Sequence, residues 1–391
     1  MPVIHHDALI VGGGLVGACL ALALQRRGLT VALIDAQAPQ AVATGEGWDT
    51  RVYAISPGNA AFLGSLGVWQ RLDPQRVQRV ESMLISGDRP AGRLSFSAYD
   101  AGLRELAFIV ESGALQRALR QAMAETGEAL PSFPERAASL QIGADCASLA
   151  LAGGRLLQAR LVVGTDGGDS WVRQAAGLEA RVTDYRQTGV VANFETGVDH
   201  RGAAYQWFRD DGVLALLPLP GRRVSMVWSA ADDHAQVLLA LPAAALAEKV
   251  MEASAGALGA LRLITPAAGF PLRLAHVPKL VAPRIALAGD AAHNVHPLAG
   301  QGVNLGFRDV RELVSVLSAR APGQDCGDLQ LLRRYERARR EDIAAMELGT
   351  DGLQKLFAAR PVWISGARNS GMAAVDRLPF LKNLLIRHAA A

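Results

Sequence analysis

The stretch Gly12-Gly13-Gly14-Leu15-Val16-Gly17 decides the fold of this chain, together with the segments on either side of it. The apolar run Ala8-Leu9-Ile10-Val11 precedes it and predicts a buried parallel strand. Residues 15–27 predict a helix, and residues 30–34 predict a second strand that ends in Asp35. A strand, a glycine-rich turn, a helix and a strand with a terminal acid, in this order, predict a Rossmann-like dinucleotide-binding α/β domain.

Each glycine of this motif has an expected task. Gly12 allows the tight turn, Gly14 lets the backbone approach a pyrophosphate, and Gly17 lets the helix lie close to the strand. The phosphates would lie at the positive N-terminus of the helix, and Asp35 would accept hydrogen bonds from an adenosine ribose. An acid at position 35 argues against the 2'-phosphate of NADP, so the ligand is FAD or NAD. A role in packing alone is the alternative for the glycines.

The composition is that of a globular protein. Half of the 391 residues are hydrophobic, a fifth are charged and the formal net charge is +3, which gives no indication of nucleic-acid binding. The cysteines form no C-x-x-C pair, which predicts a reducing compartment without disulfides; they are Cys19, Cys146 and Cys326. The uncharged run 8–25 is interrupted by glycines and follows no Lys or Arg. We therefore expect a cytoplasmic protein rather than a membrane-spanning or secreted one.

A second glycine-rich segment follows a buried strand predicted at residues 284–288. This strand ends at Gly289-Asp290, and an acid at the carboxyl end of a parallel strand faces the crevice where open α/β sheets bind ligands. Gly300, Gly302 and Gly306 then open another helix, whose N-terminus supplies N–H donors and partial positive charge. Reduced flavin carries its negative charge at N1 and C2=O. A second helix start of this kind therefore favours FAD over NAD.

Together these motifs resemble those of the group A flavin monooxygenases, which have the p-hydroxybenzoate hydroxylase fold. The resemblance covers essentially the whole chain, and it is greatest for the ubiquinone-biosynthesis hydroxylases that act on 2-polyprenylphenols. Four motifs are shared across the superfamily: Gly12-x-Gly14-x-x-Gly17, Asp49-x-Arg51, Gly164-Thr165-Asp166-Gly167-x-x-Ser170-x-x-Arg173 and Gly289-Asp290-Ala291-Ala292-His293. The longer run from His296 to Asp309 is typical of the quinone-hydroxylase branch.

The resemblance implies how two of these segments contact FAD. Asp290 would hydrogen-bond the ribityl chain. The backbone of Gly302, Val303 and Asn304 would meet the pyrimidine edge of the flavin. Both contacts require the two glycine-rich helix starts to lie close together in the folded chain.

Three further contacts are implied, and each has a plainer alternative or a weaker basis. Arg51 would lie near the flavin, but an internal salt bridge explains an arginine there equally well. Asp166 would belong to a segment that serves both FAD and nicotinamide, or it would cap the turn that follows. Ser112 would lie near the FAD phosphates. Two roles stay open for Arg173: a functional one within the Gly164–Arg173 motif, and an ordinary salt bridge of a helix.

The resemblance also implies the chemistry. NAD(P)H would reduce FAD, O2 would then form a flavin C4a-hydroperoxide, and this would hydroxylate the aromatic ring of a polyprenylphenol in ubiquinone biosynthesis. No residue is identified as a general base, and His296 is the one candidate for a residue near the substrate. His293 and His296 lack a third ligand at metal spacing, so we expect no metal site.

Two other functions stay open: a hydroxylase of a soluble phenolic substrate, and a non-catalytic flavin-binding member of a quinone-synthesis complex. A polyprenyl substrate predicts peripheral contact with the inner face of the membrane. The candidate is the amphipathic segment 378–391, with Phe380, Leu381, Leu384 and Leu385 on one helical face. The alternative is that this segment packs on its own domain or on the partner of a homodimer.

The order of the predicted elements divides the chain into interleaved parts. We expect a discontinuous FAD-binding domain at residues 1–75, 98–180 and 278–330. Short β-rich runs predict a mostly antiparallel substrate domain at 76–97 and 181–277, with a hairpin of residues 80–86 and 93–97 and a helix at 235–256. Within the FAD-binding domain, residues 154–159 and 161–163 predict two separate strands. Residues 331–391 predict a C-terminal helical region, in which the arginine-dense stretch 331–348 is expected to be solvated and salt-bridged.

Overall fold

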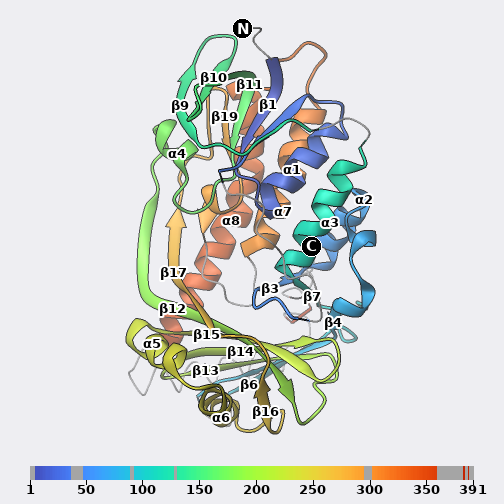
Figure 1. The fold of residues 1–391 in the computed structure, drawn as a ribbon, viewed down its shortest axis with the longest axis vertical. Helices are drawn as coiled ribbons and strands as arrows, with labels where there is room; N and C mark the ends of the chain where they lie inside the picture. Colours follow the sequence, from blue (N-terminus) through green and yellow to red (C-terminus); the bar gives the residue numbers. More distant parts are fainter. Residues whose placement is uncertain are drawn as a thin grey trace.

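The structure, a computed structural model, describes residues 5–36, 47–88, 92–126, 130–294, 302–358, 382–383 and 386. Figure 1 shows two main parts: a sheet with long helices beside it in the upper half, and a broad twisted sheet with two helices below it in the lower half. The chain passes between these parts several times, so segments distant in sequence build each of them.

The upper part is built on an eight-stranded sheet with a parallel centre. The central order is β19-β11-β1-β2-β8, and all four neighbouring pairs are parallel. These strands are β1 His5–Val11, β2 Val31–Ile34, β8 Ser132–Phe133, β11 Leu156–Gly164 and β19 Ile285–Leu287. Three more join antiparallel: β9 Ala137–Ile142, β10 Ala147–Leu151 and β18 Val281–Ala282. Residues 8–10 of β1 are fully buried, as expected for a strand covered on both faces.

The helices of this part pack around α1 (Leu15–Gln25). All but two of its 11 residues are buried, because its sequence is apolar on every side. It contacts α3 (Ser112–Ala124) and α7 (Gly302–Ser318), and α7 in turn contacts α8 (Leu329–Ala358). The shorter helices are α2 Pro57–Ser65 and α4 Trp171–Ala175, with one-turn helices η1 Trp69–Arg71, η2 Pro74–Arg76 and η3 Gly289–Ala291.

Val16 brings α1 and α7 unusually close together because glycines face it. A Cβ on Gly306 would lie 2.6 Å from Val16 Cγ2, and a Cβ on Gly289 would lie 3.1 Å from the same atom. Gly289 also has a φ of +61°, in the left-handed region that favours glycine. Since Val16 belongs to the first glycine motif, this contact places both glycine-rich segments side by side.

The lower part is a nine-stranded sheet in which nearly all pairs are antiparallel; β5 and β13 form a parallel pair. Its strands are β5 Ser82–Ser86, β6 Arg93–Ser97, β12 Arg181–Thr196, β13 Ala203–Arg209, β14 Gly212–Leu219, β15 Arg223–Ala231, β16 Leu261–Leu263, β17 Ala268–His276 and β20 His293–Asn294. Helices α5 (Asp232–Ala240) and α6 (Ala243–Ala253) share an apolar core with one face. A three-stranded sheet covers part of the other face: β3 Val52–Ile55, β4 Gln78–Val80 and β7 Ala107–Glu111.

The strand β20 joins the two parts of the molecule. It begins two residues after the η3 turn, and it pairs with β17 at the edge of the lower sheet, His276 opposite His293. The η3 turn itself follows β19 of the upper sheet. About ten consecutive residues therefore run from the centre of one sheet to the edge of the other.

Two segments differ from the sequence-based expectation. Residues 154–163 were expected as two strands, but β11 is continuous because its register with β1 runs unbroken to Val11 opposite Gly164. The helix expected at 235–256 is instead the pair α5 and α6. The break falls at Leu241-Pro242, since proline has no N–H to continue a helix.

The arginine-dense helix α8 also differs from expectation. It has a buried stripe made of Leu331, Leu332, Tyr335, Arg339 and Ile343. Its arginine ion pairs lie on this buried side, and within the described part of the chain the exposed arginines of the helix form no ion pair. None of the described helices is long and apolar enough to cross a membrane.

The contact between Val16 and Gly306 gives a testable prediction. Gly306→Ala should lower the free energy of unfolding by about 1–3 kcal/mol, because the new methyl group forces α7 away from α1. Adding Val16→Ala should recover part of this loss by restoring space. Gly64→Ala in α2, where a Cβ meets only ordinary contacts, is the matched control. Denaturant unfolding measures all four proteins, and a Gly306→Ala protein as stable as the control would contradict the prediction.

Candidate cofactor site

Two glycines of the first motif are required by the packing of the protein itself. Gly12 has a φ of +103°, and a Cβ there would overlap the carbonyl oxygen of Thr165 at the end of β11. A Cβ on Gly17 would overlap the carbonyl oxygen of Gly12. Thr165 Oγ1 completes the turn by donating to the Gly12 carbonyl at 2.8 Å. These contacts fix the position of the α1 N-terminus relative to β1 and β11.

Gly14 is different, because nothing in the protein requires a glycine there. Its backbone is extended (φ −65°, ψ −172°), and no atom of the other described residues lies within 4 Å of the position a Cβ would take. It is also the N-cap of α1, where no side chain caps the helix and the first turn holds no acid. The first N–H groups of α1 therefore face open space with a partial positive charge, an arrangement that fits a pyrophosphate.

Asp35 lies beside this turn, where its sequence position predicts it. Its carboxylate approaches Gly13 so closely that a Cβ on Gly13 would be 2.5 Å from Asp35 Oδ2. The backbone N–H of Asp35 donates to the Phe133 carbonyl at 3.0 Å, which holds the end of β2 against β8. The structure thus brings Gly12, Gly14, Gly17 and Asp35 together. Their contacts with FAD remain predictions.

Asp290 lies in the η3 turn, directly after Gly289, which contacts Val16. Its side chain is exposed, and within the described residues its carboxylate accepts no hydrogen bond. The dense protein around it raises the pKa of Asp290, while the charges of His293 and Arg51 oppose this rise and that of Asp309 adds to it. A solvent-accessible carboxylate enclosed by protein and without a partner has both oxygens available for a ligand.

Tyr53 joins the predicted residues Arg51 and Ser112 to this turn, although no sequence motif indicates a role for it. The Arg51 guanidinium lies 5.3 Å from the centre of the Tyr53 ring. The Ser112 side chain, at the start of α3, lies close enough to the Tyr53 hydroxyl to influence its pKa, and the Ser112 N–H donates to the Arg51 carbonyl at 2.9 Å. Burial raises the pKa of Tyr53. The positive charge of Arg51 and the nearby Ser112 side chain oppose this rise, and the negative charge of Asp290 adds to it. These four side chains therefore lie within electrostatic reach of one another.

Asp49 is the first residue of the motif that contains Arg51, and it holds local structure. Its Oδ2 accepts the Gly113 N–H at 2.9 Å near the start of α3, and its Oδ1 accepts the Arg51 N–H at 3.0 Å. Its carbonyl accepts the side-chain amide of Asn193, on β12 of the lower sheet, at 2.9 Å. Asp49 therefore positions the backbone of Arg51 between the two parts of the molecule.

The start of α7 is held by the side chain of Asn304, which is 1% exposed. Its Nδ2 donates to the Ala54 carbonyl at 2.7 Å, and its Oδ1 accepts the Ser56 N–H at 2.9 Å and Asn59 Nδ2 at 3.0 Å. A Cβ on Gly302 would meet no atom within 4 Å. The side chain of Asn304 thus anchors the helix, and the predicted contact of the 302–304 backbone with flavin remains a proposal.

Asp166 and Arg173 hold the segment between β11 and α4. Asp166 accepts Ser170 Oγ at 2.5 Å and the Val172 N–H at 3.0 Å, so its two oxygens cap the turn, which was the alternative interpretation. Arg173 forms no salt bridge among the described residues; it donates to the carbonyls of Ala291 at 3.0 Å and Gly168 at 2.7 Å. Arg173 therefore connects this segment to the turn that carries Asp290.

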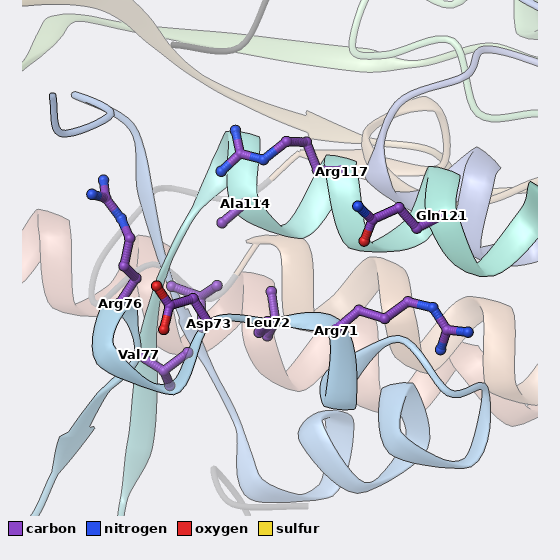
Figure 2. A pocket seen from close by; sticks show the side chains of 9 residues that line it. Arg71, Leu72, Asp73, Arg76, Val77, Ala114, Arg117 and Gln121 are labelled. Atoms are coloured by element: carbon purple, nitrogen blue, oxygen red, sulfur yellow. The ribbon is translucent and has the colours of Figure 1, made fainter. Parts of the chain in front are cut away.

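The remaining candidate, His296, lies outside the described residues, as do residues 295–301 as a whole. A small cavity of about 130 Å³ lies between the η1–η2 segment and α3 (Figure 2). It is lined by Arg71, Leu72, Asp73, Arg76, Val77, Val110, Ala114, Arg117 and Gln121. It contains none of the residues predicted to hold the cofactor, so it is not the predicted site.

Comparison with known proteins identifies the family of the chain. The model of a family described as "FAD binding domain" matches residues 5–349. Ubiquinone hydroxylase UbiL of Rhodospirillum rubrum is 37% identical over 384 residues, which cover 98% of this chain and 89% of the relative. The 3-demethoxyubiquinol 3-hydroxylase of Escherichia coli is 34% identical, with 98% of each chain covered. Ubiquinone biosynthesis monooxygenase COQ6 of Mus musculus is 30% identical and covers 98% of this chain and 91% of the relative.

Two solved structures show the same fold. PqsL of Pseudomonas aeruginosa, a probable FAD-dependent monooxygenase, superposes with a TM-score of 0.76 at 22% identity and covers 94% of this chain and 99% of that chain. The p-nitrophenol 4-monooxygenase PnpA of Pseudomonas putida superposes with a TM-score of 0.79 at 15% identity and covers 100% of this chain and 98% of that chain.

A parallel sheet joined to a large antiparallel sheet is the fold that this chain shares with these two structures. The family match and the similarity to named hydroxylases identify the class of the protein as FAD-dependent monooxygenase. The chain belongs to the FAD-binding domain family. FAD is its cofactor, and NAD(P)H is the reductant typical of this family. The expected fold class and the resemblance to group A flavin hydroxylases are confirmed.

The contrast between Gly14 and Gly17 gives a second prediction. Gly14→Ala should leave the unfolding midpoint of the FAD-free protein unchanged and weaken FAD binding at least about tenfold, since the methyl group enters space that only the ligand uses. Gly17→Ala should lower both stability and FAD affinity, because its methyl group overlaps Gly12. Flavin fluorescence titration and thermal unfolding separate the two effects. Unchanged FAD affinity in Gly14→Ala would contradict this placement of the pyrophosphate.

Proposed function

We propose that this FAD-dependent monooxygenase hydroxylates the aromatic ring of a polyprenylphenol precursor in ubiquinone biosynthesis, with O2 and NAD(P)H as co-substrates. The observation that carries this proposal is the similarity to proteins named as ubiquinone hydroxylases, at 37% and 34% identity over 98% of the chain. The fold neighbours act on varied compounds, so the fold alone does not select this substrate class.

In this proposal, the residues of the chain bind and orient the cofactor, which supplies the oxygen chemistry when bound. The N-terminus of α1 binds the pyrophosphate, and Asp35 binds the ribose. Asp290 binds the ribityl chain. Arg51 and Ser112 lie on the adjacent side, and the 302–304 backbone at the α7 N-terminus stabilises negative charge on the reduced ring.

The substrate would lie against the lower sheet. Where this sheet meets the three-stranded sheet, the core is apolar and contains Ala204, Leu217 and Leu219. Apolar surroundings exclude water from the reacting centre, which protects activated oxygen from wasteful reaction. We still propose His296 as the candidate residue near the substrate. The domain boundaries predicted from the sequence are also part of this proposal.

The third prediction concerns this reaction. The purified FAD-loaded protein should oxidise NAD(P)H faster when a short-chain polyprenylphenol is added, and mass spectrometry should find one atom from labelled O2 in the product. An unprenylated soluble phenol is the control substrate. NAD(P)H oxidation that responds to the soluble phenol alone would reject the polyprenylphenol assignment, and oxidation that responds to neither would reject turnover of this substrate class.

A membrane-resident substrate also leads us to propose peripheral contact through the segment 378–391, as part of a monomer, homodimer or quinone-synthesis complex. Only residues 382, 383 and 386 of this segment are described, and Lys382 and Ile386 are buried, which favours packing against protein. Co-sedimentation with anionic lipid vesicles tests the contact. The proposal expects the full chain to sediment more than a chain ending at residue 377; equal recovery would remove it.

A further inference from the structure

Asp309 on α7 is a fully buried carboxylate with three hydrogen-bond donors. Its Oδ2 accepts the backbone N–H of Gly289 at 2.8 Å and lies 2.6 Å from His293 Nε2, and its Oδ1 accepts Arg339 Nε at 2.7 Å. The side chains of Asp309 and His293 are 0% and 1% exposed. A buried carboxylate satisfied in this way holds each of its donors in a fixed direction.

The donors of Asp309 lie on both sides of Asp290. Gly289 precedes Asp290 directly, and His293 follows it by three residues. The turn has one further anchor, the Arg173 guanidinium on the Ala291 carbonyl. Asp290 is therefore the ligand-facing residue of a turn that is held from behind on each side, and Asp309 supplies two of the holding contacts.

The charges around Asp309 form an alternating series. Arg339 also pairs with Asp342 at 2.6 Å, and Asp342 pairs with Arg308 at 3.1 Å. Burial and the positive charge of Arg339 both lower the pKa of His293. The charge and the hydrogen bond of Asp309 have the larger effect, so the pKa of His293 is raised. The net effect of His293 and Arg339 keeps the pKa of Asp309 low in spite of its burial. His293 thus lies between the carboxylates of Asp309 and Asp290, and both of these charges raise the pKa of its ring.

We propose that Asp309 is a positioning residue for the cofactor: through Gly289 and His293 it orients the turn so that Asp290 meets the ribityl hydroxyls. This inference rests on the proposed role of Asp290 in binding FAD. Asp309 itself is buried behind the turn and acts only through its neighbours.

Asp342 provides a matched control for a purely structural role. It belongs to the same series of ion pairs, and its hydrogen bonds to other described residues join Arg339 on α8 and Arg308 on α7 rather than the residues 289–293 of the turn. If Asp309 only stabilises the packing of α7 on α8, removal of either acid should have the same kind of effect. If Asp309 positions the turn, only its removal should weaken FAD binding strongly.

The experiment compares Asp309→Asn, Asp342→Asn and Asp290→Asn with the wild-type protein, by FAD titration and by thermal unfolding of the FAD-free forms. We expect both Asp309→Asn and Asp342→Asn to lower the unfolding midpoint. We expect Asp309→Asn and Asp290→Asn to weaken FAD binding about 10- to 100-fold, the range found when supporting partners of binding residues are removed, and Asp342→Asn to weaken it less than about threefold. The flavin absorption spectrum of the loaded variants reports whether the ring environment also changes.

Equal losses of FAD affinity in Asp309→Asn and Asp342→Asn would overturn the proposal. If Asp309→Asn does not fold, His293→Phe replaces it, since phenylalanine has no N–H to donate to Asp309 Oδ2; unchanged affinity in that variant would also overturn the proposal. Normal affinity in Asp290→Asn would instead refute the role of Asp290. A wild-type protein that binds no FAD would refute the cofactor site as a whole.

Discussion

The close contact of Val16 with Gly289 and Gly306 is the constraint on which the site depends. The first N–H groups of α1 and of α7 have no partner within their own helix, and a helix N-terminus attracts negative charge only over the length of its first turn. Two such termini act on a single ligand only if the helices are close. Larger side chains at positions 289 and 306 would separate the helices and leave two unrelated anion sites.

The strand β20 extends this constraint to the lower sheet. Its backbone pairs with β17, its first residue is His293, and the turn before it carries Asp290. The lower sheet therefore cannot shift at this edge without moving the turn that faces the cofactor. Such a connection keeps the distance between the two sheets constant at this edge.

Local sequence patterns were sufficient to predict those strands, turns and helix starts that short runs of residues determine. The glycine motif with its strands, the second glycine-rich helix start and the hairpin of β5 and β6 all follow from residue spacing. The side-chain partners could not be found in this way. Asn304 reaches Ala54 and Ser56, about 250 residues earlier, and nothing in the spacing of either segment indicates such a contact.

Arg339 shows why the prediction of a solvated, salt-bridged helix at 331–348 was wrong for its buried side. It continues the apolar stripe of Leu331, Leu332 and Tyr335 at helical spacing, and a charged residue on such a stripe is the signal for a buried ion pair. Its partner Asp309 lies in a different helix, so residue spacing within α8 cannot indicate the pair. The FAD contacts of the predicted residues also stay predictions, because proximity of side chains does not by itself establish what they bind.

Stability alone does not account for the buried acid Asp309. Removing charges from water is costly, and well-packed apolar residues of similar volume are often at least as stabilising as a buried ion pair. An apolar side chain, however, has no acceptor for the N–H of Gly289, which must be paired because the residue is buried. Only a group with several acceptor sites can hold that N–H, His293 and Arg339 together. Compared with an apolar core, the charged groups at this place therefore orient the turn that carries Asp290, because their hydrogen bonds are directional.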